Sequence, residues 1–192
     1  MRADKARNRD AVLAAAGRLF DAATDPDEVS MDAVATAAGV GKGTIFRGFG
    51  DRRGLIRALY DGRVAAEFDA LGPIEDATGD PGAAPADIAY GLLVRTWRFK
   101  ERNRVLALAL EREGYGSPYQ NESYDSLHAQ LKTLIAHTRG TTNADFVAHG
   151  LLAAVRSDLV EHLHAHPDTD PEAGLRALVE GVFGTSGTEP ER

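Results

Sequence analysis

The sequence predicts an all-α protein with a three-helix, helix-turn-helix DNA-binding domain at its N-terminal end and a second helical domain behind it. Apolar residues recur at helical spacing along most of the 192 residues, and glycine, proline and capping residues divide this pattern into separate helices. Charge is divided along the chain as well. Ten basic and eight acidic residues give residues 1–60 a net charge of +2, whereas the whole chain has −7. A basic end on an acidic chain favours nucleic-acid binding at that end.

Residues 1–50 are expected to form the DNA-binding domain. Apolar positions from Val12 to Phe20 predict its first helix. Ser30 can accept a hydrogen bond from the amides that begin the second helix. Gly39 is expected to end that helix, because glycine adopts the left-handed conformation without a side-chain penalty. A third helix from Gly41 to Phe49 can then leave at a steep angle, which is the layout of a helix-turn-helix that binds DNA.

The outer face of the third helix carries side chains of the types that contact DNA. Lysine and arginine contact phosphates and guanine, and threonine offers a hydroxyl and a methyl group to base edges. We expect Thr44 and Arg47 at base edges and Phe46 against a sugar or a thymine methyl group. Backbone phosphates are assigned to Ser30, Lys42, Gly43 and Arg52. The alternative is a three-helix packing unit that never binds nucleic acid.

The segment Gly39–Phe49, G-V-G-K-G-T-I-F-R-G-F, followed by Asp51, Arg52 and Leu55, resembles the signature of TetR-type (tetracycline-repressor-like) transcriptional regulators. Matching positions upstream extend the resemblance over roughly the first third of the chain. The family commonly has tyrosine where this chain has Phe46 and histidine where it has Gly48, and both usually donate to DNA phosphates. The resemblance implies a homodimeric repressor that binds a palindromic operator in double-stranded DNA and is released by a small-molecule effector. The alternative function is a ligand-binding or scaffolding helical dimer that has lost DNA binding.

The remaining elements are predicted from helical spacing and from Gly- and Pro-rich breaks. Residues 51–71 are expected to hold a connecting helix, Asp51–Phe68, with Asp51 as its cap, and residues 72–86 a loop. The C-terminal domain, residues 87–184, then holds five helices capped in part by Asn103, Asn143 and Asp170. These helices are Asp87–Lys100, Arg104–Glu113, Glu122–Arg139, Ala144–Ala165 and Asp170–Phe183, and residues 185–192 are expected to be a disordered tail.

The C-terminal domain is expected to bind a ligand and to dimerise. Its last two helices carry more apolar residues than one small core needs, and the resemblance implies a four-helix bundle across a two-fold axis. Aromatic and polar residues of its middle helices are typical of a small-molecule cavity, although ordinary core packing is the alternative for each. The candidate lining residues are Tyr90, Trp97, Leu106, Leu110, Tyr124, His128 and His149.

Composition argues against other function classes. Cysteine is absent, which excludes disulfides and thiolate metal sites. In the run of residues 162–166 only His162 and His166 have the spacing of metal ligands, and their place at a helix end is typical of a dipole interaction, so no metal and no cofactor is predicted. No phosphate-binding glycine loop or nucleophile elbow indicates an enzyme. No apolar run reaches the roughly 20 residues that span a bilayer, so we expect a cytoplasmic protein without a membrane partner.

Overall fold

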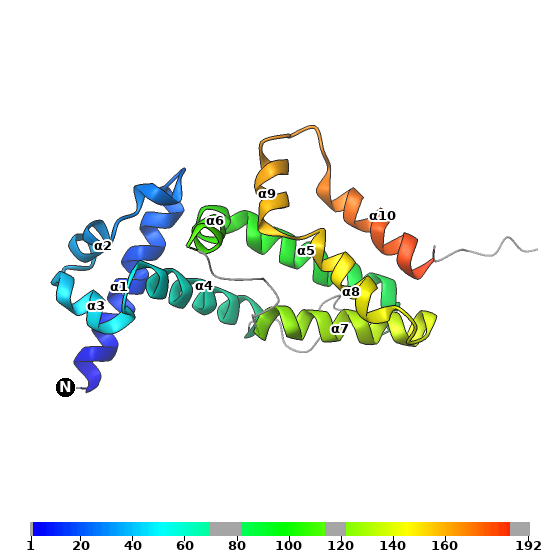
Figure 1. Cartoon of the computed structure of the whole chain (residues 1–192), viewed down its shortest axis with the longest axis horizontal. Coiled ribbons are helices and arrows are strands. Elements are labelled where there is room, and N and C mark those ends of the chain that lie inside the picture. The colour runs from blue at the N-terminus through cyan, green and yellow to red at the C-terminus, as the bar shows by residue number, and fades with distance from the viewer. Residues whose placement is uncertain (1, 70–81, 114–121, 185–192) are drawn as a thin grey trace, which may run out of the picture. The chain divides into compact units, whose positions relative to one another are not determined.

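The computed structural model describes residues 2–69, 82–113 and 122–184, and in these ranges the chain is built from helices without a strand (Figure 1). The all-α prediction is therefore confirmed. The described residues form two compact units. The first unit contains residues 2–68 and 103–113, and the second contains residues 82–102 and 122–184.

The first unit packs its helices around a small apolar core. Its elements are α1 (Arg2–Ala22), the 3-10 turn η1 (Pro26–Glu28), α2 (Met31–Ala38), α3 (Lys42–Phe49), α4 (Arg52–Asp69) and α6 (Arg104–Arg112). Helix α1 packs against α2, α3 and α6. Val12, Ile45 and Ile56 are almost completely buried in the core. Burial also raises the pKa of Tyr60 to about 12, with the carboxylates of Glu111 and Asp61 as smaller causes, so this phenol is neutral at ordinary pH.

The turn between α2 and α3 follows the local signals in the sequence. Ser30 accepts a hydrogen bond from the Ala33 amide at 3.1 Å, which caps α2. Gly39 lies in the left-handed region with φ 66° and ends the helix. The Asp51 carboxylate accepts a hydrogen bond from the Gly54 amide at 2.8 Å and caps α4. All three predicted helix signals are confirmed, and together they define the helix-turn-helix.

Helix α4 begins unusually close to the end of α3. A Cβ atom added at Gly54 would lie 2.0 Å from the carbonyl oxygen of Phe49, a distance that only a backbone shift can relieve. By contrast, a Cβ atom at Gly62 on the same helix would meet nothing within 4 Å. Gly54 therefore permits the close approach between α3 and α4, and Gly62 has no such role.

The second unit consists of helices around a core that includes Trp97 and Leu131. Its elements are α5 (Pro85–Arg102), α7 (Glu122–Arg139), α8 (Ala144–Ala153), α9 (Ser157–His164) and α10 (Pro171–Phe183). Helix α5 packs against α7, α9 and α10, and α7 packs against α8. The predicted cap of the last helix is confirmed, because the Asp170 carboxylate accepts hydrogen bonds from the amides of Glu172 and Ala173.

The single helix predicted for Ala144–Ala165 is wrong. Helix α8 ends at Ala153 and α9 begins at Ser157, with Arg156 in an extended conformation between them. The Asp158 carboxylate accepts hydrogen bonds from the Arg156 guanidinium and from the Leu159 amide, which stabilises a new helix start. The Lys100 ammonium donates to the Val155 carbonyl oxygen at 2.7 Å, so the break leaves this carbonyl satisfied.

Two predicted caps are also wrong. Asn143 precedes α8 in the left-handed conformation, with φ 64°, and its side chain makes no capping bond. Asn103 makes no capping bond either, because its Oδ1 atom accepts a hydrogen bond from Arg63 at 2.6 Å. Helix α5 begins at Pro85 rather than Asp87, since the fixed φ of proline suits the first turn of a helix.

The predicted domain boundaries at residues 50, 71, 86 and 184 stay predictions. Most of the predicted loop, residues 72–81, and the predicted tail, residues 185–192, lie outside the described residues. Helix α6, which those boundaries assign to the C-terminal domain, groups with the first unit.

Candidate nucleic-acid interface

Helix α3 is anchored on one side and exposed on the other. Ile45 is 1% exposed and fixes the inner face of the helix in the core of the first unit. The residues that share the outer face are Lys42, Gly43, Phe46 and Arg47, all of them exposed. Phe46 is 49% exposed, which is uncommon for a large apolar side chain. The amphipathic pattern of α3 therefore presents the predicted contact residues to solvent.

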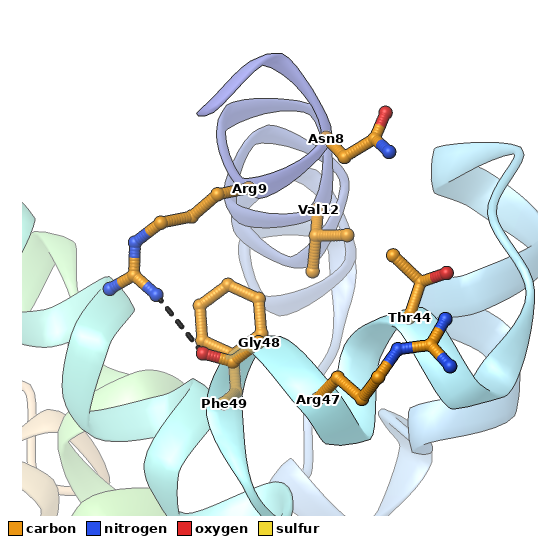
Figure 2. Close-up of a pocket in the computed structure, with 7 residues that line it drawn as sticks. All are labelled: Asn8, Arg9, Val12, Thr44, Arg47, Gly48 and Phe49. Atoms are coloured by element: carbon orange, nitrogen blue, oxygen red, sulfur yellow. Dashed lines mark hydrogen bonds between the residues drawn. The ribbon is translucent and has the colours of Figure 1, made fainter. Parts of the chain in front are cut away.

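Arg9 of α1 holds the C-terminal end of α3. Its guanidinium donates to the Gly48 carbonyl oxygen at 3.3 Å and lies 4.6 Å from the centroid of the Phe49 ring (Figure 2). A cation is favourable at a helix C-terminus and over an aromatic face. Arg9 thus positions α3 against α1.

A groove of about 420 Å³ runs between α1 and α3. Figure 2 shows Thr44 and Arg47 projecting from α3 on the same side as Asn8 of α1. Val12 and Phe49 supply apolar surface in the groove. Amide, hydroxyl and guanidinium groups over an apolar floor can bind phosphate oxygens and base edges together.

The two cationic side chains of α3, Lys42 and Arg47, differ in whether they are paired with another residue. Lys42 forms an ion pair with Asp32 of α2, and both side chains are more than half exposed. The exposed side chain of Arg47 makes no hydrogen bond or ion pair with another described residue. Arg47 is therefore the cation of α3 that is available to DNA without breaking an existing pair.

Arg52 is used inside the first unit. It donates to the carbonyl oxygens of Pro26 at 2.7 Å and Val29 at 3.3 Å, and it forms an ion pair with Glu113. Its side chain is 25% exposed. This geometry favours a structural role for Arg52 over the phosphate contact expected from the sequence.

A second arginine network holds η1. The Arg112 guanidinium pairs with Asp25 at 3.0 Å and with Asp27 at 3.4 Å. The hydrogen bond from the Asp27 amide, followed by the Arg112 contact, holds the pKa of Asp25 below its usual value. The segment that leads into α2 is therefore fixed by charge as well as by packing.

The N-terminus of α3 is open. Gly41 occupies the capping position without a side-chain hydrogen bond. Added Cβ atoms at Gly41 and Gly43 would meet no backbone within 4 Å, so a phosphate can approach the first amides of the helix. Ser30 already caps α2 through its Oγ atom and can still donate its hydroxyl proton to a phosphate.

The residues expected to line an effector cavity fall into separate groups. Tyr124, His128 and His149 lie together in the second unit. Trp97 is buried in α5, and Tyr90 on the same helix lies under the Arg176 guanidinium, 3.5 Å from it. The other two, Leu106 and Leu110, belong to α6 in the first unit.

Asn8 and Arg9 line the groove but are absent from the sequence-based contact set. Both lie within one helical turn of the buried Val12, so helical spacing places them near the face that packs on α3. Their partners on α3 depend on how α1 crosses it, which spacing alone does not give. No helix in the described ranges is both long and apolar enough to cross a membrane.

Comparison with known proteins agrees with this geometry. Residues 12–59 match the model of bacterial regulatory proteins of the tetR family. No curated protein sequence matches the chain.

Three solved structures are similar over nearly their whole length. A TetR-like transcriptional regulator from Rhodococcus sp. RHA1 is 22% identical, with a TM-score of 0.63 over 93% of this chain and 97% of that chain. A TetR transcriptional regulator from the same organism is 18% identical, with a TM-score of 0.59 over 96% and 100%. NalD, the secondary repressor of the MexAB-OprM multidrug efflux pump in Pseudomonas aeruginosa, is 19% identical, with a TM-score of 0.57 over 94% and 95%. The chain therefore has the fold of these regulators.

Proposed function

We propose that this protein is a DNA-binding transcriptional repressor. The premise is that residues 12–59 match the tetR family model and that the chain has the fold of its regulators. The protein binds a palindromic operator as a homodimer and is released by a small-molecule effector. Such a protein acts on DNA in the cytoplasm and needs no catalytic activity.

The observation that carries the proposal is the outer face of α3. Arg47 is exposed and engaged by no described residue, and Thr44 lies beside it at the groove. We assign these two side chains to base edges and Phe46 to a sugar or a thymine methyl group. Lys42, Gly43 and Ser30 are assigned to phosphates. Because so few side chains of one chain contact DNA bases, a second copy of the chain is needed for tight binding to the operator.

The homodimer is assigned to α8 and α10. Five of the eleven apolar residues predicted for a dimer surface are buried within the second unit itself: Leu151, Leu152, Val155, Leu175 and Val179. Phe146 on α8, 78% exposed, and Leu178 on α10, 48% exposed, are left as large apolar side chains in solvent. Exposed apolar side chains of this size favour a protein partner, and a second copy of the chain is the partner that a palindromic operator needs.

An effector is supported less directly, by the polar and aromatic residues of the second unit. Tyr124, His128 and His149 offer hydrogen-bonding groups beside stacked rings. The alternative function is a ligand-binding dimer that has lost DNA binding, which is favoured by the absence of hydroxyl and imidazole donors at Phe46 and Gly48.

The test is a gel-shift titration of the protein on the intergenic DNA upstream of its own gene, with unrelated DNA as competitor and a series of salt concentrations. A regulator binds that fragment selectively and loses affinity steeply with salt. Sedimentation measures the oligomeric state of the wild type and of the variants Phe146→Glu and Leu178→Glu. We expect a dimer for the wild type and a larger monomer fraction for each variant. A folded wild-type dimer with no preference for the fragment at low salt would replace the repressor with the ligand-binding alternative.

A further inference from the structure

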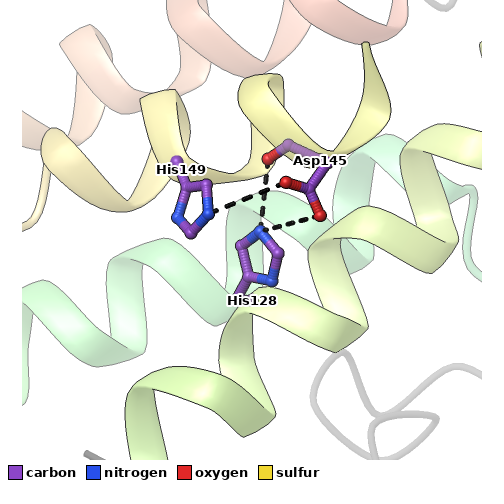
Figure 3. A group of neighbouring side chains, drawn as sticks. All are labelled: His128, Asp145 and His149. Carbon is purple, nitrogen blue, oxygen red and sulfur yellow. Dashed lines mark hydrogen bonds and ion pairs between the residues drawn. The ribbon is translucent and has the colours of Figure 1, made fainter. Parts of the chain in front are cut away.

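Two histidines and one aspartate meet where α7 packs on α8. His128 comes from α7, and Asp145 and His149 lie one turn apart on α8 (Figure 3). One ligand atom from each side chain lies within 4.8 Å of the other two. The rings of His128 and His149 are stacked with centroids 3.9 Å apart. The packing of α7 on α8 therefore brings His128 close to Asp145 and His149, from which it is well separated in sequence.

We propose that His128, Asp145 and His149 form a binding site for one divalent transition-metal ion of the zinc class. Zinc is bound by imidazole nitrogens and carboxylate oxygens at roughly 2.0–2.2 Å, which places neighbouring ligand atoms about 3.4 Å apart in a tetrahedral site. His128 Nε2 lies 3.9 Å from Asp145 Oδ1 and 3.2 Å from the Asp145 carbonyl oxygen, and His149 Nε2 lies 3.9 Å from Asp145 Oδ2, so side-chain rotations must bring the three ligand atoms to that spacing. Asp145 is exposed and both histidines are partly exposed, so water can complete the coordination.

The ring of His149 is already oriented for this role. Its Nδ1 atom lies 2.6 Å from the Tyr124 hydroxyl oxygen, and its Nε2 atom faces the Asp145 carboxylate at 3.9 Å. Metal-bound histidines usually donate their second N–H to a neighbouring oxygen, which fixes the tautomer that leaves the other nitrogen free to bind. Tyr124 is thus a positioning residue of the site rather than a ligand.

The Asp145 carboxylate is paired with a lysine in this structure, at the position where a metal ion would bind. The Lys132 ammonium lies 2.6 Å from Asp145 Oδ1, and its hydrogen bond holds the pKa of that carboxyl below the usual value. Lys132 is 49% exposed, so its side chain can swing into solvent when an ion binds. The Lys132 ammonium competes with a metal ion for Asp145, and its positive charge repels that ion. Removing the lysine charge should therefore strengthen metal binding.

The donor set selects among metals. Two imidazoles with one carboxylate suit Zn²⁺, Co²⁺ or Ni²⁺, whereas Mg²⁺ and Ca²⁺ prefer sites made only of oxygen. Occupation of the site would join α7 to α8 through ligands from both helices. The inference concerns metal binding alone and stands whether or not the protein binds DNA.

The experiment is calorimetric titration of the full chain, free of any histidine tag, with Zn²⁺ and with Co²⁺, whose visible absorption reports coordination by imidazole. We expect one ion per chain and little heat with Mg²⁺. His128→Ala and His149→Ala should each weaken Co²⁺ binding at least tenfold, and Tyr124→Phe should weaken it about tenfold. Lys132→Gln should strengthen it several-fold.

The matched control is the double variant His162→Ala/His166→Ala. These two histidines are four residues apart, at and just after the C-terminal end of α9, and their ring centroids lie 4.3 Å apart, so they are a second place where metal could bind. The control should bind Co²⁺ like the wild type. The proposal fails if the control abolishes binding, if the wild type binds no ion, or if His128→Ala and His149→Ala bind normally while remaining helical by circular dichroism.

Discussion

In both units cationic side chains pair with carboxylates, and in the first unit three arginines also bind backbone carbonyl oxygens. In the first unit Arg9, Arg52 and Arg63 donate to backbone carbonyl oxygens of other elements, at Gly48, at Pro26 and Val29, and at Gly17. In the second unit Arg98, Arg176 and Lys132 pair with carboxylates on exposed helix faces, and Lys100 donates to a carbonyl oxygen.

This difference matters because the two kinds of contact have different strengths. The half-buried guanidinium groups of Arg52 and Arg63 fix the position of the backbone that they bind, and losing one leaves a carbonyl oxygen without its donor. An exposed ion pair is screened by water and salt and contributes little. In the first unit, which carries the candidate DNA interface, losing one of these backbone contacts should therefore cost more free energy of unfolding than losing an exposed ion pair in the second unit.

The largest expected loss of stability in the first unit comes from disrupting the close contact between α3 and α4. Gly54→Ala forces a Cβ atom against the Phe49 carbonyl oxygen, and we expect a loss of about 3 kcal/mol or more in the free energy of unfolding. Gly62→Ala is the control on the same helix and should stabilise by about 0.5–1 kcal/mol. Urea denaturation followed by circular dichroism measures both. Equal stability of the two variants would mean that α3 and α4 have room to separate.

Arg52 allows the two kinds of contact to be compared directly. Arg52→Met leaves Pro26, Val29 and Glu113 without their donor and should cost about 2 kcal/mol of unfolding free energy. Arg98→Met, which removes the exposed pair with Glu172 in the second unit, should leave the denaturation midpoint unchanged.

The same variant decides the role of Arg52 at DNA. If Arg52→Met keeps its stability but lowers the salt slope of DNA binding by about one, the phosphate contact expected from the sequence is correct and the structural role is not.

The exposed cations of α3 are expected to differ in what they recognise. Arg47→Ala should weaken operator binding about tenfold and relax preference at one base pair, because a base contact is lost. Lys42→Ala should weaken all DNA sequences alike and lower the salt slope by about one. Binding to a set of single-base operator variants separates the two effects. A uniform loss for Arg47→Ala would assign it to a phosphate.

The smallest change concerns Phe46 and Gly48, the two positions at which the matched segment, residues 12–59, departs from the pattern common in the tetR family. Nothing lies within 4 Å of a Cβ atom at Gly48, so the backbone at this position accepts a side chain. In Gly48→His the added donor to a phosphate should raise DNA affinity about threefold, as should the hydroxyl of Phe46→Tyr. Gly48→Ala gains the same helix propensity without a donor and is the control. An equal gain from alanine would show that helix stability, not phosphate binding, limits affinity.

Local features of the chain were predictable from sequence. Ser30, Gly39 and Asp170 act on their own helix ends, so residue type and spacing are sufficient to assign them. The break between α8 and α9 was missed because apolar spacing continues through it, and the Lys100 contact that satisfies its carbonyl comes from another helix.

The candidate sites show the same limit. The face of α3 follows from helical spacing, since Ile45 inside implies Phe46 and Arg47 outside. The internal role of Arg52 depends on Pro26 and on Glu113 of α6, which are distant in sequence. His128 meets Asp145 only because α7 packs on α8. Contacts between distant segments are set by packing, and one sequence does not reveal them.

The single tryptophan of the chain, Trp97, is 4% exposed and lies on α5 in the second unit. Its fluorescence emission therefore monitors that unit alone, without any label, whereas far-ultraviolet circular dichroism sums the helices of both. Unfolding curves that coincide by these two signals would indicate that the units melt cooperatively. Curves that separate would give the stability of each unit from one sample, and would show whether a bound ligand is sensed beyond the unit that holds it.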